Sequence, residues 1–194
     1  MAGGRPEYMP VLIAAIAAIS DPTFGFQALN STTCAVIPAI IVNGPIAKQI
    51  RLSSGYGMMG PDPQHPAASI IGRSLRLIQQ NLVGAIPGVG TMVIYCGLRA
   101  TNAILAEDEE GLPKGWTSVA EDRGFKREQN VVTVTPISGM ANINPAINNG
   151  IGVLDVKQQN DIMLRQLAKF MASPTGNIWN TVNKPVWASP DHML

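Results

Sequence analysis

The sequence predicts an α/β (or α+β) fold, a single domain in which a mostly buried sheet is covered by helices. Apolar runs of strand length alternate along the chain with stretches of helical periodicity, the pattern of helices packed on a sheet. The length of 194 residues suits one domain, residues 1–194, with one hydrophobic core. A hydrophobic fraction of 46% excludes an intrinsically disordered chain.

The first part of the chain is predicted to be a helix followed by a buried strand. Residues 7–20 form the helix, which ends where Asp21 precedes Pro22, because a residue before proline avoids the helical region. Residues 34–42 (CAVIPAIIV) are short, apolar and rich in β-branched side chains, as in a strand covered on both faces. Pro38 within it is expected at a bulge or an edge, since proline donates no ladder hydrogen bond.

A turn, a loop and the most regular helix of the sequence come next. The turn is at residues 43–45 (NGP), and residues 46–52 are predicted to form a short helix. Residues 53–64 (SSGYGMMGPDPQ) form a loop, and loops of this length in a compact domain tend to be functional. The regular helix covers residues 66–82, where isoleucine and leucine recur at helical spacing.

The middle of the chain is predicted to contain two short strands. Residues 84–90 form a turn and residues 91–96 (TMVIYC) a strand. Residues 101–106 are a second apolar run, and four consecutive carboxylate residues follow it directly. Residues 119–123 are expected to be irregular.

Two further strands and one helix are predicted toward the C-terminus. Residues 131–135 (VVTVT) form a clear strand that ends at Pro136. Residues 155–172 form the last helix, and residues 186–188 begin another strand.

Charged side chains are scarce and unevenly placed. They make up 14% of the residues, where an average soluble domain has about 25%. Twelve of the 27 lie between Arg99 and Glu128, whereas residues 77–98 and 129–154 carry none. Because neutral stretches of this length must partly reach the surface, they predict contact surfaces and therefore a subunit of an oligomer. A monomer coated with Ser, Thr, Asn and Gln is the alternative.

The composition also argues against nucleic-acid and membrane proteins. The net charge of +1 offers no excess of lysine and arginine for nucleic acid or for an anionic membrane. The apolar segment of residues 11–19 is too short to span a bilayer. The residues before it contain Glu7 and a single basic side chain, unlike a secretory leader, so we expect a cytoplasmic protein.

Metal and nucleotide chemistry have little support in the sequence. Cys34 and Cys96 form no CxxC pair, and two histidines are too few for an ordinary zinc site, so no metal is predicted. There is no P-loop and no GxGxxG between a strand and a helix. The residues do not identify a cofactor, which is therefore unknown at this point.

The glycine-rich loop is one candidate site. Ser53, Ser54 and Tyr56 bring hydroxyl groups among glycines that allow close backbone approach, so the loop could hold a polar substrate or an anion. The turn that contains Asn43 and Gly44 precedes this loop. A structural connector that covers a sheet edge fits the loop equally well.

The acidic run is a second candidate. An apolar strand that delivers Glu107 and its neighbours to one end of a sheet would crowd carboxylates, raise at least one pKa and provide a general acid or base. Acidic runs are more often solvated faces. Arg73 could clamp a carboxylate or pair with this run, or form a structural salt bridge. Cys34 is a candidate nucleophile, although such a cysteine is more often a small buried side chain.

Several segments give the chain a resemblance to a known family. They are, in order, GGRPEYMPVLIAAI, IVNGPIAKQI, SSGYGMMGP, ASIIGRSLRLI, NLVGAIPG, AILAEDEE, EDRGF and VVTV. Over most of the chain they resemble the uncharacterised bacterial family of UGSC-type (seleno)proteins. That family takes its name from a Cys/Sec-Gly-Ser-Cys motif, which implies thiol or selenol chemistry. The motif is absent here, so the resemblance implies a companion domain or subunit.

Three reactive positions of the family pattern differ in this chain. Cys34 stands where the family has a histidine, Ile104 and Leu105 stand where it has a cysteine, and Val119 and Ala120 stand where it has a second histidine. The family pattern also continues past the point at which this chain stops. A partner chain that supplies the remainder would account for this difference.

The residues and the resemblance together lead to one hypothesis. The chain is a subunit of a hetero-oligomeric enzyme, a thiol-dependent reductase or a lyase or hydratase acting on a small carboxylate, and a second protein chain carries the reactive thiol or selenol. A pocket at the subunit junction binds a small polar molecule through Asn43, Gly44, Ser53, Ser54 and Arg73, with Tyr56, Glu107 and Cys34 as catalytic candidates. A scaffold subunit with a vestigial pocket is the alternative, and an independent homo-oligomeric binding protein is a third.

Overall fold

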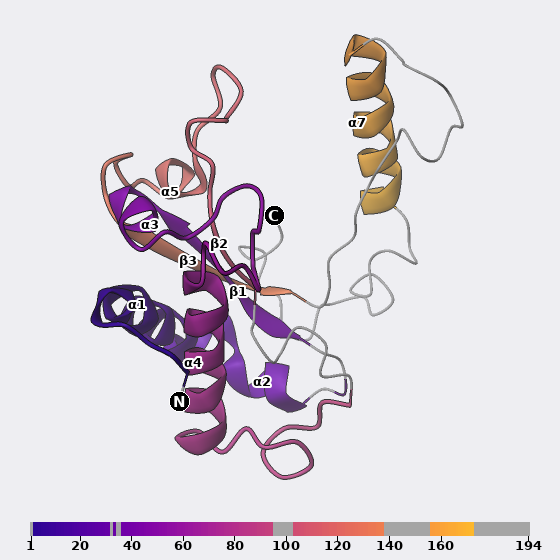
Figure 1. Ribbon diagram of the computed structural model, residues 1–194. Helices are drawn as coiled ribbons and strands as arrows, with labels where there is room; N and C mark the ends of the chain where they lie inside the picture. The colour runs from indigo at the N-terminus through magenta and orange to yellow at the C-terminus, as the bar shows by residue number, and fades with distance from the viewer. Residues whose placement is uncertain (1, 32, 34–35, 95–102, 138–155, 173–194) are drawn as a thin grey trace. The chain divides into compact units, whose positions relative to one another are not determined.

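The computed structural model describes residues 2–31, 33, 36–94, 103–137 and 156–172 (Figure 1). The chain divides into two compact units, residues 1–139 and residues 140–194. The first unit contains the sheet. In the second unit the described residues form helix α7 (Val156–Ala172), which confirms the predicted last helix. The single domain over residues 1–194 stays a prediction.

A three-stranded mixed sheet is the centre of the first unit. Its strands are β1 (Ile37–Asn43), β2 (Ala103–Ala106) and β3 (Val131–Ile137), in the order β2-β1-β3. β1 runs parallel to β2 and antiparallel to β3. With the helices packed against it, this sheet confirms the α/β or α+β fold class (Figure 1).

β1 is the central strand and is buried along almost its whole length, as its apolar sequence predicts. Pro38 lies inside this strand, opposite Pro136 of β3, and not at the expected bulge or edge. Neither proline has an N–H to donate, so both missing donors fall in one register pair of the β1–β3 ladder.

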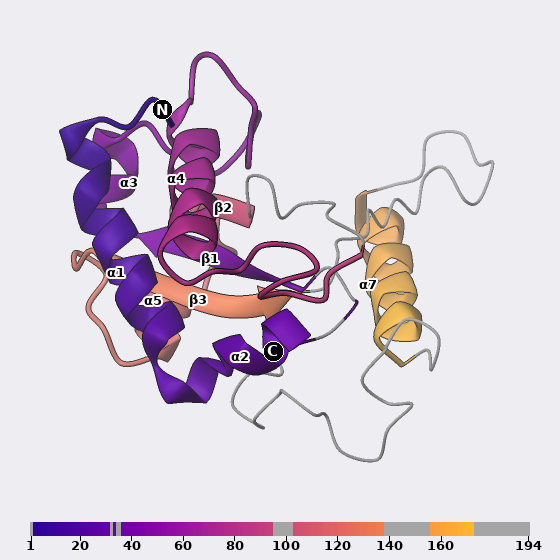
Figure 2. The ribbon, with the colours of Figure 1, turned by 90° about the horizontal axis from the view of Figure 1, so that it is seen from below.

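Two helices cover the sheet and contact each other (Figure 2). α1 (Met9–Ser20), which follows the short 3-10 helix η1 (Pro6–Tyr8), packs on β3 and β1. α4 (Ala67–Asn81) packs on β2. Both predicted helices are thus confirmed. α1 buries a stripe of side chains at helical spacing, which are Val11, Leu12, Ala15 and Ile19.

Short elements lie between these helices and the strands. After α1, the side chain of Asp21 accepts a hydrogen bond from the Thr23 amide at 2.8 Å and starts η2 (Pro22–Phe24), which is followed by α2 (Phe26–Ser31). α3 (Pro45–Gln49) follows β1 directly and confirms the predicted short helix. The segment from β1 through α3 and α4 to β2 is a parallel crossover, so everything between β1 and the start of α4 lies at the carboxyl ends of these two strands.

The predicted strand over residues 91–96 is wrong for the part that is described, residues 91–94. Thr91 forms an isolated bridge with Pro87, and the amides of Met92 and Ile94 donate to the carbonyls of Asn30 and Thr33. These carbonyls belong to the end of α2 and the residues after it, and not to a neighbouring strand. The described part of the apolar run, residues 91–94, is therefore not a strand of the sheet, and Tyr95 and Cys96 lie outside the described residues.

The segment 119–123, expected to be irregular, begins with a helix, α5 (Val119–Asp122). Ser118 and Glu121 form a capping box, in which each side chain accepts a hydrogen bond from the backbone amide of the other. The spacing of a serine and a glutamate three residues apart was visible in the sequence. The capping box satisfies amides at the helix start, which allows a helix of only four residues.

Replacing Ser118 by alanine is expected to lower the free energy of unfolding by about 1 kcal/mol. Ser118 is fully buried, so its loss also leaves the Glu121 amide without a partner. Chemical denaturation of the variant measures the change. Ser31→Ala is the control, because that exposed hydroxyl bonds only the carbonyl of Ala28 and its loss should cost little; equal losses in the two variants would refute the role given to the capping box.

The remaining predicted elements agree with the structure where it describes them. The strand over residues 131–135 is confirmed as β3, which continues through Pro136 to Ile137. Residues 186–188 lie outside the described part. Among the described helices none is by itself long and apolar enough to cross a membrane; residues 6–20 and 22–31 reach that length and composition only as a pair bent by 72°.

Candidate functional site

A polar pocket lies where the two parallel strands end. Asn43 is the last residue of β1, and Glu107 follows the last residue of β2. The register pairs Val42 with Ala106, so the two polar residues emerge from adjacent strand ends. The cavity has a volume of about 430 Å³, and α3, the acidic run and the segment before β3 line it. Ligands of open α/β sheets commonly bind at this edge.

The buried side chain of Asn43 holds two glutamates of the acidic run by hydrogen bonds. Its side chain is 1% exposed, and its Nδ2 donates to Oε2 of Glu107 at 2.6 Å and to Oε1 of Glu109 at 2.9 Å. Both hydrogens of the amide are therefore used on carboxylates. Glu107 also accepts from the Val119 amide at 2.9 Å, which brings the start of α5 to the site. Two donors from separate elements thus hold the Glu107 carboxylate in one orientation.

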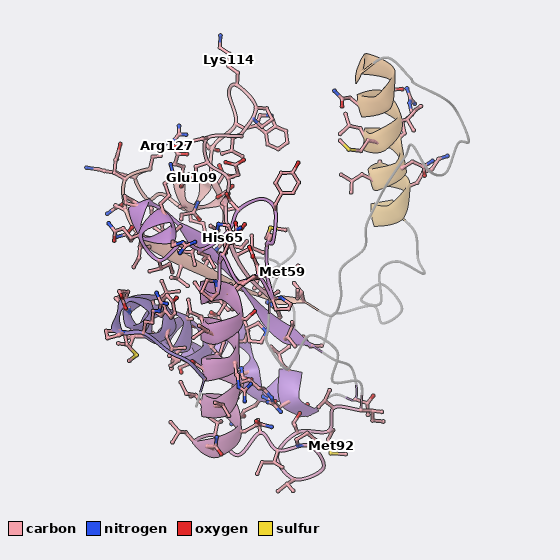
Figure 3. All side chains as sticks on the ribbon, viewed as in Figure 1. Met59, His65, Met92, Glu109, Lys114 and Arg127 are labelled. Carbon is pink, nitrogen blue, oxygen red and sulfur yellow. The ribbon has the colours of Figure 1, made fainter. Side chains whose placement is uncertain are left out.

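The last two residues of the acidic run contact cations. Lys48 of α3 forms an ion pair with Glu110, and Nη2 of Arg127 donates to the backbone carbonyl of Glu109 at 2.7 Å (Figure 3). The hydrogen bond from Lys48 lowers the pKa of Glu110, and the same bond raises the pKa of Lys48. For Glu110 the direction is the opposite of the rise expected from crowding, because the nearest charge is positive.

Gly44 makes the close approach of two segments possible. Its φ of +86° lies in a region that glycine tolerates, and a Cβ built on it would lie 2.3 Å from the carbonyl oxygen of Gln129. The next residue of that segment, Asn130, accepts a hydrogen bond from the Ile46 amide through its Oδ1 at 2.8 Å. The start of α3 and the segment that lines the pocket beside β3 are therefore fastened together.

The loop of residues 53–64 is joined to the end of β2. The Ala106 amide donates to the carbonyl of Ser53 at 3.2 Å, and the Ser53 hydroxyl donates to the carbonyl of Tyr56 at 2.7 Å. Ser53 is buried and shapes the turn, whereas Ser54 lines the pocket. The side chain of Tyr56 is fully exposed and is not part of the lining.

Of the predicted site residues, the structure therefore brings together Asn43, Gly44, Ser54 and Glu107, with Ser53 behind them. Arg73 is exposed on α4 and does not line this pocket. Its neighbour one turn along, Arg76, is the buried arginine of α4, and its Nη2 donates to the carbonyl of Ala85 at 3.0 Å. Cys34 lies outside the described residues.

The sequence did not predict the two cations of the site, nor a histidine–aspartate pair in the loop of residues 53–64 and the residue that follows it. Lys48 and Arg127 line the pocket, and only the clustering of charge after Arg99 pointed toward one of them. In the loop, Nδ1 of His65 lies 2.5 Å from Oδ2 of Asp62. This pair is at the same end of the sheet, because the loop precedes α4, and Figure 3 shows His65 at the same end as Glu109. The D-x-x-H spacing was its only signal.

Replacing His65 by leucine is expected to raise the pKa of Asp62 toward its ordinary value of 3.8, because leucine removes the hydrogen bond from His65, which is the main cause of the lowered pKa. A carboxyl whose pKa is lowered on folding adds stability above pH 3.8, and this contribution is lost as the pH falls through the folded-state value. NMR titration of Asp62 measures the pKa. Asp21, whose pKa is lowered by Thr23, is the internal control and should not move; an unchanged Asp62 would refute the pairing.

The arrangement suits acid–base and binding chemistry. A carboxylate held by two donors, a lysine and an arginine surround a cavity of small-molecule size. Within the described ranges, no cluster of three or more His, Cys, Asp and Glu side chains is arranged to hold a metal ion.

Comparison with other proteins adds no further information about this site. No protein-family model matches the chain, and neither a curated protein nor a solved structure matches it at a significant level. The resemblance to the UGSC-type family therefore stays a prediction.

Proposed function

We propose that this chain is a cytoplasmic subunit of a hetero-oligomeric enzyme that acts on a small polar molecule at the pocket beyond β1 and β2. The observation that carries the proposal is the position of Asn43 and Glu107 at the ends of two adjacent parallel strands, where a hydrogen bond joins them and Glu107 lines a cavity. The resemblance to the UGSC-type family supports a partner chain that brings a reactive thiol or selenol.

Glu107 is the proposed general acid or base. Its carboxylate has a fixed orientation, because Asn43 and the Val119 amide hold it, and it lines the cavity. A positioned carboxylate can take a proton from a substrate and return it, as both a reductase and a lyase or hydratase require.

The charge of the pocket defines the kind of substrate. Five carboxylates line it against two cations; the acidic residues are Glu107, Asp108, Glu109, Glu110 and Glu128. Since Lys48 is paired with Glu110, the excess negative charge favours a substrate with hydrogen-bond donors or a positive group over a strongly anionic one. The proposed substrate is therefore a small polar molecule, neutral or cationic.

Replacing Glu107 by glutamine in the assembled complex is expected to lower kcat by at least about 100-fold, the usual contribution of a general acid or base. The native assembly is first purified and its chains are identified by mass, with a chain carrying Cys-Gly-Ser-Cys or Sec-Gly-Ser-Cys expected beside this one. Turnover is then measured on the intact complex. Glu7→Gln is the matched control, because this exposed glutamate on η1 does not line the pocket.

Other outcomes are equally informative. Full turnover of an intact Glu107→Gln complex would reject the pocket as the catalytic site and favour a scaffold subunit. A native assembly that contains only this chain would reject the hetero-oligomer. Tyr56→Phe and Arg73→Ala test the two predicted residues that lie outside the lining; we expect both variants to retain turnover.

A further inference from the structure

The loop that follows α4 carries an uncharged patch of exposed apolar side chains. The sequence has no charged residue from position 77 to position 98. Within residues 82–94 the structure exposes six large apolar side chains, which are Leu82, Val83, Ile86, Val89, Met92 and Ile94. The side chains of Leu82 and Val89 are 80% and 82% exposed. Apolar side chains gathered in this way usually mark a contact surface.

The backbone of this loop is hydrogen-bonded within the chain. The amides of residues 89–91 all donate to the carbonyl of Ile86, at distances from 2.9 to 3.2 Å, and close a tight turn at the tip. The Ala85 amide donates to a carbonyl of α4 at 2.9 Å, and the Met92 amide donates to a carbonyl of α2 at 2.9 Å. The tip is therefore held in one shape, and these amides need no water, so an apolar surface can cover the loop at little cost.

Apolar hollows lie beside this loop. The end of α1, the residues of η2 and α2, and the second half of α4 enclose a cavity of about 670 Å³, whose walls include Ile16, Phe26 and Ile78. A smaller hollow of about 380 Å³ lies between α2 and the loop itself. Phe26 and Val83 line both cavities, so the loop and the hollows form one continuous surface. Figures 1 and 2 show the loop beside α2 in both views.

A protrusion and a hollow on one surface fit a second copy of the same chain. In a twofold-symmetric contact the same surface of each copy meets the other, so this surface must complement itself. Val83 belongs to the loop and also lines the larger hollow, so a twofold axis near this residue places the tip of each loop over the hollow of the other copy. The single charged residue of that lining, Asp21, already accepts two hydrogen bonds from Thr23. Covering the hollow therefore removes no other charge from water.

We propose that two copies of this chain associate through this surface, with Val89 and Met92 at the tip of each loop seated in the hollow between α1, α2 and α4 of the other copy. The contact does not involve the proposed enzymatic pocket, because the linings of the two cavities share no residue. In Figure 3, Met92 lies at the opposite end of the first unit from Glu109 and Arg127. The polar pocket therefore stays open to substrate and to a different partner chain when two copies associate.

Sedimentation equilibrium of the full chain, expressed without other chains, measures this association, and we expect a dimer at micromolar concentration. Met92→Asp places an unpaired charge in the contact twice, once in each copy, and should raise the dissociation constant by at least about 100-fold. Met58→Asp is the matched control. That methionine is also exposed, but it lies in the loop of residues 53–64 and lines neither hollow, so we expect its dissociation constant to stay unchanged.

A second measurement identifies the contact in the natural chain and does not depend on how the variants fold. Deuterated chains that carry protonated methyl groups only at valine are mixed with deuterated chains that carry them only at isoleucine. A valine–isoleucine NOE in this mixture arises only between copies. We expect NOEs from the Val89 methyl groups to those of Ile16 and Ile78, which line the larger hollow.

Four results would overturn the proposal. A dimer that Met92→Asp leaves intact, or one that lacks the Val89 NOEs, would mean that the contact lies elsewhere. A monomeric chain that enters its native assembly unless Met92 is replaced would assign the surface to a different partner chain. A monomeric chain that floats with vesicles of phosphatidylcholine would assign it to a lipid surface. Each of these outcomes leaves the role of Glu107 in the polar pocket to its own test.

Discussion

Replacing Asn43 by aspartate is expected to destabilise the folded chain by about 3–5 kcal/mol at neutral pH, the cost of a buried charge without a partner. The side chain is 1% exposed, and its Nδ2 donates to the carboxylates of Glu107 and Glu109 at 2.6 and 2.9 Å. Aspartate has the same size, but an oxygen, which only accepts, takes the place of the donating Nδ2. The two hydrogen bonds would become contacts between negative groups in a buried position.

The pH dependence distinguishes this cause from a simple packing defect. Folding disfavours the ionised form of a buried carboxyl, so the new carboxyl weakens the folded state most when it is ionised. The loss in free energy of unfolding of Asn43→Asp should therefore shrink as the pH is lowered and carboxylates become protonated. Urea denaturation at several pH values measures it. Asn81→Asp is the control, because that exposed residue at the end of α4 bonds only the Leu77 carbonyl, and we expect a loss below about 1 kcal/mol. A deficit in Asn43→Asp that stays constant with pH would contradict the repulsion.

Replacing Gly44 by alanine is expected to cost on the order of 3 kcal/mol of stability. The backbone at Gly44 has φ +86° and ψ −177°, a conformation that residues other than glycine rarely adopt. In addition, the new Cβ would lie 2.3 Å from the carbonyl oxygen of Gln129 and 3.0 Å from the Cα of Asn130. These are backbone atoms, so relief requires the segment beside β3 to move away from α3, which opens the polar pocket.

Gly124→Ala gives a comparison without the contact. Gly124 has the same φ of +86°, but a Cβ there would meet no atom within 4 Å. Its replacement should therefore show the cost of a positive φ alone, on the order of 1 kcal/mol. Thermal or chemical unfolding of both variants gives the comparison. Equal losses would show that the contact with Gln129 is not what requires glycine at position 44.

The helices and strands with strong local patterns could be predicted from the sequence. α1 and α4 follow from the period of their apolar side chains, and β1 and β3 follow from runs of β-branched residues. One error occurred where a tertiary partner decides, and the other where a local capping signal was not recognised. Residues 91–94 have strand composition but bond the end of α2, and α5 exists because a capping box closes four residues that have no helical period.

The sequence predicted only part of the candidate site, because contacts between distant residues assemble the rest. Asn43 and Glu107 could be named, because a polar residue after an apolar strand run marks a strand end. The parallel pairing of β1 and β2 that places them together, and the donation from Asn43 to two carboxylates, depend on residues 64 and 66 positions apart in the chain. Lys48 and Arg127 line the same pocket because segments that are distant in the chain meet there.

The sequence by itself determined the fold class, the main helices and strands, and the concentration of charge in one part of the chain. Only the tertiary structure decided that Asn43 holds Glu107 and that Tyr56 and Arg73 lie outside the polar pocket. The physical reason is range: helical and strand periodicity are local properties of consecutive side chains, whereas burial and hydrogen bonding are set by residues that become neighbours only when the chain folds.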